Sequence, residues 1–183
     1  MSKNEQNRIK ELIDRLGRIA AADEWGEDIN PTQWTALSYL ARANRFSRSP
    51  SQVSDFMTAT RGTVSQTLKA LARKDLISEV RSDQDKRSIS YSVTPKGDAL
   101  LQKTGVIDDA VNTLKNEEAA SLLSGLEALA RAALKQRGLR AFGVCETCVH
   151  HRKMAKGGHC ELLNERLSAA ESKQLCHEYS DAA

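Results

Sequence analysis

The chain has 183 residues, of which 40% are hydrophobic and 28% are charged, with a formal net charge of +3. This length allows one domain of ordinary size plus a small appendage. No segment has the roughly 20 consecutive apolar residues that a membrane-spanning helix needs. The first residues, Met-Ser-Lys-Asn-Glu, lack the apolar run of a secretion signal. We therefore expect a cytoplasmic protein with no membrane partner.

The first 30 residues are expected to form a long helix with one apolar face. Its stripe consists of Ile9, Leu12, Ile13, Leu16 and Ile19, which recur at helical spacing. Standing alone, such a helix would leave the stripe in water, so the segment is predicted to pack against a partner.

A short helix is predicted over residues 50–57. It opens at Pro50-Ser51, where a serine can cap the free backbone N–H groups. Its apolar residues share one side of the helix and are Val53, Phe56 and Met57. A break follows at residues 58–60.

A second helix is predicted over residues 61–74, with Thr60 as its cap and a buried stripe of Val64, Leu68 and Leu71. The other side is small, polar and basic. Its candidate DNA-contacting residues are Arg61, Thr63, Ser65, Gln66, Lys69 and Arg73. Such a face fits the major groove, where serine and glutamine can bond to base edges and basic side chains can reach bases or phosphates. Taken alone, an ordinary solvated helix face explains the pattern equally well.

A β-hairpin with a polar tip is predicted directly after this helix. Its strands cover residues 77–81 and 88–93, and the second alternates apolar residues with serines. Lys86 and Arg87 near the tip can reach phosphates or a narrow minor groove. Asp85, whose charge phosphate would repel, is expected to stabilise the hairpin instead. Thr94-Pro95 then caps and opens another helix. Together these elements predict a mainly α (α+β) protein with a winged helix-turn-helix that binds double-stranded DNA.

The run LKALARKDLISEVRSDQDKRSISYSVTPKG closely resembles the recognition helix, wing and wing exit of the MarR family of bacterial transcription regulators. The likeness covers roughly residues 5–137 and is most specific over residues 64–97. Asp85 and Arg87 match the family's wing, and Thr94 and Gly97 match the wing exit. The resemblance implies a homodimer that binds a pseudo-palindromic operator, usually as a repressor, and a pocket for a small-molecule effector. Asp75 departs from the family, which usually has glycine after the recognition helix.

More apolar stripes follow, between residues 98 and 137. They comprise Leu100, Leu101, Ile107, Val111, Leu114, Leu122, Leu126, Leu129 and Leu134. With the N-terminal stripe they predict long dimerisation helices packed across a twofold axis, which matches the spacing of operator half-sites. An intrachain bundle is the alternative.

Residues 42–103 hold 12 Lys and Arg against 6 Asp and Glu, so basic charge is concentrated on the predicted DNA-binding domain.

All four cysteines and all four histidines fall in the last 39 residues. The candidate metal ligands are Cys145, Cys148, Cys160 and Cys176. In a reducing cytoplasm a cluster that opens with Cys-x2-Cys is better explained by a metal site than by disulfides. The predicted organisation is therefore residues 1–30 and 98–137 for dimerisation, 31–97 for DNA binding, and a small Cys-rich appendage over 144–180.

The sequence leaves the identity of the metal open. Cysteine spacings of 2, 11 and 15 residues suit an iron-sulfur cluster, which is favoured, and loosely resemble winged-helix regulators with such clusters in a C-terminal segment. A structural zinc site is the alternative, in which His159 or His177 could replace a thiolate, and free redox-active or core thiols are a third.

The parts combine into a homodimeric transcription regulator, expected to be a repressor, whose operator affinity is controlled by an iron-sulfur cluster or metal. With structural zinc, a small-molecule effector would provide the signal instead. A thiol-disulfide enzyme at Cys145-x2-Cys148 is the rival class, but the strand-helix alternation of thioredoxins is missing and no other catalytic motif is found. We therefore expect no enzymatic activity.

Overall fold

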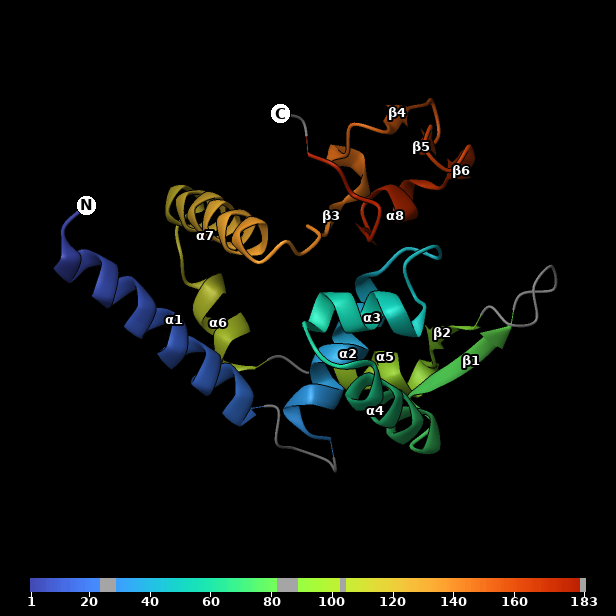
Figure 1. Cartoon of the computed structure of the whole chain (residues 1–183), viewed down its shortest axis with the longest axis horizontal. Coiled ribbons are helices and arrows are strands. Elements are labelled where there is room, and N and C mark those ends of the chain that lie inside the picture. The colour runs from blue at the N-terminus through green and yellow to red at the C-terminus, as the bar shows by residue number, and fades with distance from the viewer. Residues whose placement is uncertain (24–28, 82–88, 103–104, 182–183) are drawn as a thin grey trace.

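The computed structural model describes residues 1–23, 29–81, 89–102 and 105–181 (Figure 1). The helices are α1 (Lys3–Asp23), α2 (Pro31–Arg42), α3 (Pro50–Met57), α4 (Arg61–Arg73), α5 (Pro95–Leu101), α6 (Val106–Asn112), α7 (Asn116–Gln136) and α8 (Ala169–Ser172), with a 3-10 turn, η1 (Cys145–Thr147). The strands are β1 (Ile77–Arg81), β2 (Ile89–Val93), β3 (Gly143–Val144), β4 (His151–Lys153), β5 (Gly158–Cys160), β6 (Glu165–Leu167) and β7 (Leu175–Cys176). The fold is mainly helical with a small β wing, as predicted.

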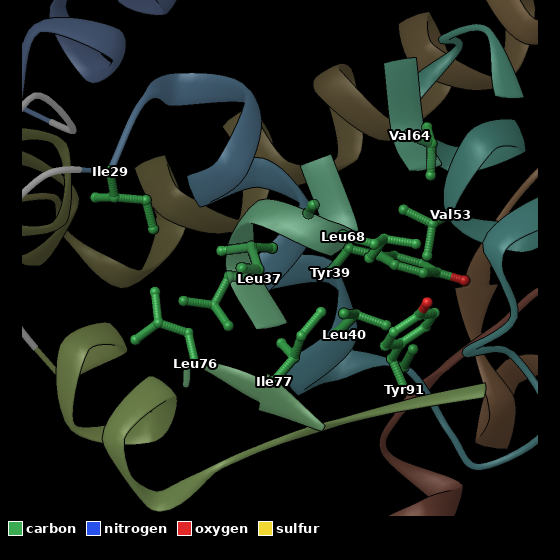
Figure 2. Close-up of a cluster of buried hydrophobic side chains, with 13 residues drawn as sticks. Ile29, Leu37, Tyr39, Leu40, Val53, Val64, Leu68, Leu76, Ile77 and Tyr91 are labelled. Atoms are coloured by element: carbon green, nitrogen blue, oxygen red, sulfur yellow. The ribbon is translucent and has the colours of Figure 1, made fainter. Parts of the chain in front are cut away.

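The core of the winged domain lies between α2, α3, α4 and the β1–β2 hairpin (Figure 2). Val64, Leu68 and Leu71 are buried from α4, which confirms the predicted stripe. Strands β1 and β2 pair antiparallel, and Tyr91 turns its ring inward. The side of α2 that carries Leu37, Tyr39 and Leu40 completes the core, although sequence analysis had not singled it out.

Local capping chemistry sets the ends of the helix-turn-helix. Thr60 accepts the backbone N–H of Thr63 at 3.2 Å and caps α4, as predicted. The cap of α3 is a correction, because Ser49 rather than Ser51 holds this position and forms a capping box with Gln52. The reason is that Pro50 occupies the first helical position, which needs no N–H donor, so the capping residue must precede it.

Two backbone positions fix the exit from α4 and from the wing. Asp75 adopts a left-handed backbone with φ 59°, the conformation for which the resemblance had implied glycine. At the wing exit, Thr94 caps α5 by accepting the N–H of Gly97 at 3.1 Å. A Cβ at Gly97 would lie 2.3 Å from the carbonyl oxygen of Leu76, so only glycine lets α5 approach the core this closely.

Helices α1, α6 and α7 lie together on the side of the molecule away from the wing (Figure 1). Neither α6 nor α7 has a buried residue. The five predicted apolar residues of α1 are 37–50% exposed, and Leu122, Leu126 and Leu129 of α7 are 43–47% exposed. Leu100 and Leu101 are a correction, because they pack on the winged-domain core instead of joining this exposed surface. No described helix is long and apolar enough to cross a membrane.

The last part of the chain, residues 143–181, is referred to as the cysteine segment. It contains a two-strand sheet of β3 and β7, a three-strand sheet ordered β4-β5-β6, and α8. In Figure 1 it sits beside α3 and the loop of residues 43–49 that joins α2 to α3. Phe142 precedes it and packs edge-on against Tyr39 and Phe56 at 5.8 and 5.3 Å, so the short stretch after α7 is docked on the winged domain.

Candidate DNA-binding surface and cysteine cluster

The outward side of α4 brings together the six helix residues predicted to contact DNA, and we refer to it as the recognition face. Arg61, Thr63, Gln66, Lys69 and Arg73 are exposed, and Ser65 is half-buried. Thr63 shares a 2.9 Å hydroxyl contact with the cap Thr60, so its hydroxyl also serves the helix end. The face therefore offers hydrogen-bonding groups at its middle and basic groups at both ends, as binding in a major groove requires.

The interior side of α4 differs from the prediction in one residue. Thr67 is buried with 7% exposure, and its hydroxyl donates to the carbonyl of Thr63 at 2.9 Å. This back-bond satisfies the hydroxyl inside the apolar core, so Thr67 extends the packing stripe instead of the recognition face.

The wing residues Asp85, Lys86 and Arg87 lie outside the described residues. The strands that lead to them are defined, because β1 and β2 pair in register from Ile77 with Val93 to Arg81 with Ile89.

The four cysteines gather in one place, which we refer to as the cysteine cluster. Cys145 is the first residue of the turn η1 and Cys148 directly follows it, and the N–H of Cys148 donates to the carbonyl of Cys145 at 3.1 Å. Cys160 comes from β5 and Cys176 from β7. Cys145, Cys160 and Cys176 are buried with Leu167 in a small core, and Cys148 is partly exposed. Its sulfur accepts the N–H of Ser180 at 3.4 Å.

The electrostatics of the cluster concentrate negative charge on one sulfur. A hydrogen bond from the Cys145 thiol lowers the pKa of Cys176 to about 6 against the opposing effect of burial, with help from Asn44, the backbone of Glu178, and Ser47. The same hydrogen bond raises the pKa of Cys145, as do burial and the other three cysteines. The thiolate form, which binds metals, is therefore favoured on Cys176 over Cys145.

No three His, Cys, Asp or Glu side chains in the described part of the chain stand ready to hold a metal ion as they are placed. The cysteines are nevertheless within electrostatic reach of one another, since the other three all act on Cys145. The predicted metal ligands are therefore neighbours in space.

The histidines that could have replaced a thiolate are placed differently. His177 directs Nε2 to Asp55 at 2.9 Å and Nδ1 to Glu178 at 3.2 Å, so both ring nitrogens have partners away from the cluster. His159 precedes Cys160 in β5, and neighbouring strand residues point to opposite faces. Its buried Nδ1 has no hydrogen-bond partner within the described residues.

Two residues that sequence analysis missed belong to this site. Asn44 and Ser47, in the α2–α3 loop, are each only 1% exposed, and both lower the pKa of Cys176. Buried polar side chains in a loop need hydrogen-bond partners, so the burial of this pair indicates that both residues have a structural role. No local pattern in the sequence marks these residues, because their partner is about 130 residues away.

Residues 27–88 match the model of the MarR family. The fold is that of a MarR-type winged helix-turn-helix. It is similar to that of Streptococcus pneumoniae FabT in complex with DNA, with a TM-score of 0.59 and 24% identity over 73% of this chain and 98% of FabT. No curated protein sequence matches the chain.

Two further structures show the same fold. The transcriptional regulator BldR from Sulfolobus solfataricus gives a TM-score of 0.56 at 19% identity, over 72% of this chain and 99% of BldR. The S. aureus MepR-DNA complex gives 0.54 at 22% identity, over 70% of this chain and 97% of MepR. The match to the MarR family model and the likeness to the transcriptional regulator BldR agree with the expectation of a regulator and not an enzyme. Each match leaves more than a quarter of this chain without a counterpart.

Proposed function

We propose that this protein is a sequence-specific, DNA-binding transcription regulator that acts as a homodimer, most simply as a repressor in the cytoplasm. The observation that carries the proposal is the recognition face, which presents Gln66, Lys69 and Arg73 to solvent on a helix anchored by a full apolar stripe. Double-stranded DNA is the partner that this combination of hydrogen-bonding and basic groups fits. Similar folds bound to DNA, in FabT and MepR, support the same assignment.

The homodimer is proposed from the apolar surface of α1 and α7. Ile9, Ile13 and Leu16 of α1 are 41–50% exposed, and Leu123 of α7 is 60% exposed. A monomer would leave two apolar helix faces in water, whereas a second copy buries both across a twofold axis. A twofold dimer then places two recognition faces on successive half-sites of an operator.

The proposed control of this regulator lies in the cysteine cluster, which would hold an iron-sulfur cluster or zinc. The support is the convergence of Cys145, Cys160 and Cys176, from η1, β5 and β7, into one small core, with Cys148 directly after η1. A segment of this size with few buried aliphatic side chains needs a metal or docking to be stable. If the metal is only structural, a small-molecule effector bound near the dimer helices is the alternative source of the signal.

The test is selection of duplexes from a random-sequence library, followed by binding measurements on the selected sequence and an unrelated one. The regulator is expected to bind the selected duplex about 10³-fold or more tightly at physiological salt. Selection should also enrich a sequence with two related half-sites. If no sequence is enriched and both duplexes bind equally, the protein is not a sequence-specific regulator.

A further inference from the structure

We propose that the cysteine segment is a strut between α7 and the helix-turn-helix, and that this strut sets the spacing of the operator half-sites that the dimer selects. Arg45 of the α2–α3 loop and Asp55 of α3 are then positioning residues that determine specificity for this spacing. The inference rests on the proposed function, because half-site spacing has meaning only for a dimer with two recognition faces. The contacts that form the strut involve no cysteine sulfur.

Apolar packing does not hold α7 on the winged domain. Within the described residues, α7 buries no side chain, and it contributes none to the winged-domain core or to the side chains packed on that core. Apolar contact is the usual means of fixing one helix on another part of a protein. Other contacts must therefore fix the position of the winged domain relative to α7, and the chain that follows α7 provides them.

The chain leaves α7 in a defined direction. Gly138 adopts a left-handed backbone with φ 63°, and its N–H donates to the carbonyl of Lys135 at 3.1 Å. The N–H of Leu139 donates to the carbonyl of Leu134 at 3.0 Å. Together these two bonds form a Schellman motif, which ends a helix in a fixed turn. Residues 140–142 then lead directly into β3.

This short stretch is anchored on the winged domain at Phe142. Its ring packs edge-on against Tyr39 of α2 and Phe56 of α3, with ring centroids 5.8 and 5.3 Å apart. Two residues earlier, Arg140 forms an ion pair with Glu178 at 3.0 Å. An aromatic anchor on the winged-domain core therefore lies only six residues beyond the end of α7.

The end of the cysteine segment returns to α7. Asp181 lies 3.7 Å from the guanidinium of Arg131 on α7 and accepts the hydroxyl of Tyr179 at 3.2 Å. Tyr179 packs against the small core of the segment, and its ring lies so close to Gly143 that a Cβ there would be 2.6 Å away. The segment therefore contacts the helix through its last residues as well as through the chain that enters it.

The cysteine segment is joined to the α2–α3 loop by its main chain and by mutual packing. The N–H of Asn44 donates to the carbonyl of Leu175 at 2.9 Å. The N–H of His177 donates to the hydroxyl of Ser47 at 2.9 Å. Leu175 packs against the winged-domain core, and Phe46 of the loop packs against the small core of the segment. Because each part places a side chain against the core of the other, we expect the segment and the loop to move together.

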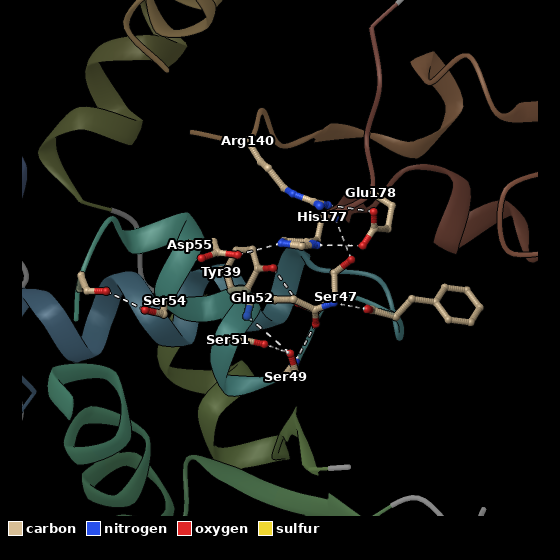
Figure 3. Close-up of polar contacts among 12 residues, drawn as sticks. Tyr39, Ser47, Ser49, Ser51, Gln52, Ser54, Asp55, Arg140, His177 and Glu178 are labelled. Carbon is tan, nitrogen blue, oxygen red and sulfur yellow. Dashed lines mark hydrogen bonds and ion pairs between the residues drawn. The ribbon is translucent and has the colours of Figure 1, made fainter. Parts of the chain in front are cut away.

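Side-chain contacts extend this attachment to α3 and to the tip of the loop. Nε2 of His177 lies 2.9 Å from the carboxylate of Asp55 on α3 (Figure 3). Arg45 forms ion pairs with Glu171 and, at 3.3 Å, with Glu165. Exposed ion pairs add little to stability unless several act as a network. Their removal is therefore expected to loosen the position of the segment without unfolding it.

The loop carries the position of the segment into the helix-turn-helix. The carbonyl of Ser47 accepts the hydroxyl of the core residue Tyr39 at 2.6 Å. Ser49 caps α3, and Gln52 of α3 donates to the carbonyl of Phe46 at 2.7 Å. Helix α3 packs against α4, which carries the recognition face. A continuous series of contacts therefore joins α7 to the recognition face through the segment, the loop and α3.

In a twofold dimer, this series of contacts determines how far apart the two recognition faces lie. Half-sites read from one side of a duplex lie about 34–36 Å apart, one helical turn or a multiple of it. Each added base pair moves the second half-site by about 3.4 Å and turns it by about 35°. A fixed strut therefore accepts one spacing, whereas a loose one accepts several.

The experiment measures the affinity of the full-length protein for a series of duplexes with different spacings. The series contains the selected duplex, the same duplex with one or two base pairs inserted or removed between its half-sites, and a duplex with a single half-site. We expect the unmodified protein to bind the altered spacings about 5- to 150-fold more weakly, the loss that a single mismatched base pair causes.

Two variants loosen the strut at opposite ends. The double variant Arg45→Ala with Asp55→Ala removes the side-chain contacts on the loop and α3, at positions that are 44% and 54% exposed. Insertion of Gly-Ser-Gly-Ser after Leu139 lengthens the stretch between α7 and β3 and leaves every side chain in place. The matched control is Arg152→Ala with Glu161→Ala, which removes an exposed 3.5 Å ion pair inside the segment. Circular dichroism establishes that each variant is folded, and the insertion tests the strut even if the double variant is not.

Both strut variants are expected to bind all spacings within about twofold of one another, the range expected when two sites act independently. They should keep the affinity of the unmodified protein for the single half-site, because the recognition face is unchanged. The control should keep the sharp spacing preference. A merely structural role would change stability or half-site affinity but not the ratio of affinities across the series.

The outcomes separate the strut from the function on which it rests. A sharp spacing preference in both strut variants overturns the strut, as does equal binding of all spacings by the unmodified protein. In either case, preference for the selected half-sites over an unrelated duplex still identifies a sequence-specific regulator. Loss of half-site affinity in both variants also overturns the strut, because the changes then act on the helix-turn-helix itself. Selection of no sequence, or of one with a single half-site only, refutes the proposed dimeric regulator.

Discussion

Replacement of Lys69 by alanine tests the recognition face and the dimer in one measurement. Lys69 is exposed on α4, and we expect it to neutralise a phosphate. Each phosphate contact contributes about 0.9 to the slope of log K against log salt concentration. A twofold dimer places two copies of Lys69 on the operator, so Lys69→Ala should reduce the magnitude of the slope by about 1.8.

The assay is fluorescence anisotropy with the selected duplex over a series of salt concentrations. Lys153→Ala is the matched control, since Lys153 is an exposed lysine on β4 in the cysteine segment. A slope reduction of only about 0.9 would mean one contact per complex and would contradict a symmetric dimer. Identical slopes for the two variants would refute the placement of the recognition face on the DNA backbone.

Three further changes probe specificity, assembly and stability. Gln66→Ala should lose about 1–3 kcal/mol of discrimination at one base pair in each half-site, measured against duplexes with single substitutions; uniform weakening across all of them would contradict direct readout. Leu126→Asp, at a position 47% exposed in α7, should yield a monomer by sedimentation equilibrium, whereas Val149→Asp, equally exposed at 48%, should leave the dimer intact. Gly97→Ala should destabilise the fold by about 1–3 kcal/mol in urea unfolding, because its Cβ would meet the carbonyl of Leu76 at 2.3 Å; an unchanged midpoint would refute this close packing.

The helix-turn-helix was predictable because its signals are local. Thr60 and Thr94 sit directly before their helices, and the stripe of α4 repeats at helical spacing, so neighbouring residues determine both features. The cap of α3 shows how precisely such local signals can be interpreted. Three serines lie near Pro50, and Ser49 is the cap because proline prefers the first helical position.

Residues with more than one possible partner were harder to place. Leu100 and Leu101 continue the apolar pattern of the later helices, yet they pack on the winged-domain core, since α5 is brought to that core by the close approach at Gly97. Periodicity gives the face of a helix that is buried but not what covers it. The same limit leaves the dimer as a proposal, although its apolar stripes were identified and found exposed.

The cysteine segment shows which features composition can predict and which depend on the fold. Its four cysteines stand out in the sequence, and three of them, Cys145, Cys160 and Cys176, share one small core. The docking surface did not stand out, because Arg45 and Ser47 meet partners more than 120 residues away and look like ordinary loop residues in the sequence. Contacts of such long range depend on the fold of both parts, so no local pattern encodes them.

The small size of the cysteine segment is itself a reason to expect regulation at this interface. Its own buried core holds three thiols and Leu167, with Phe46 of the winged domain packed against them, so hydrophobic burial contributes little to its stability. With a metal bound as proposed, thiolate ligation and docking would together stabilise the segment, which would then change when the metal leaves. Because its docking site is the loop that caps α3, such a change would reach the DNA-binding helices without a separate transmitting element. A metal placed elsewhere in the chain, for example on the exposed end of α1, would have no such contact and could alter stability without altering DNA affinity.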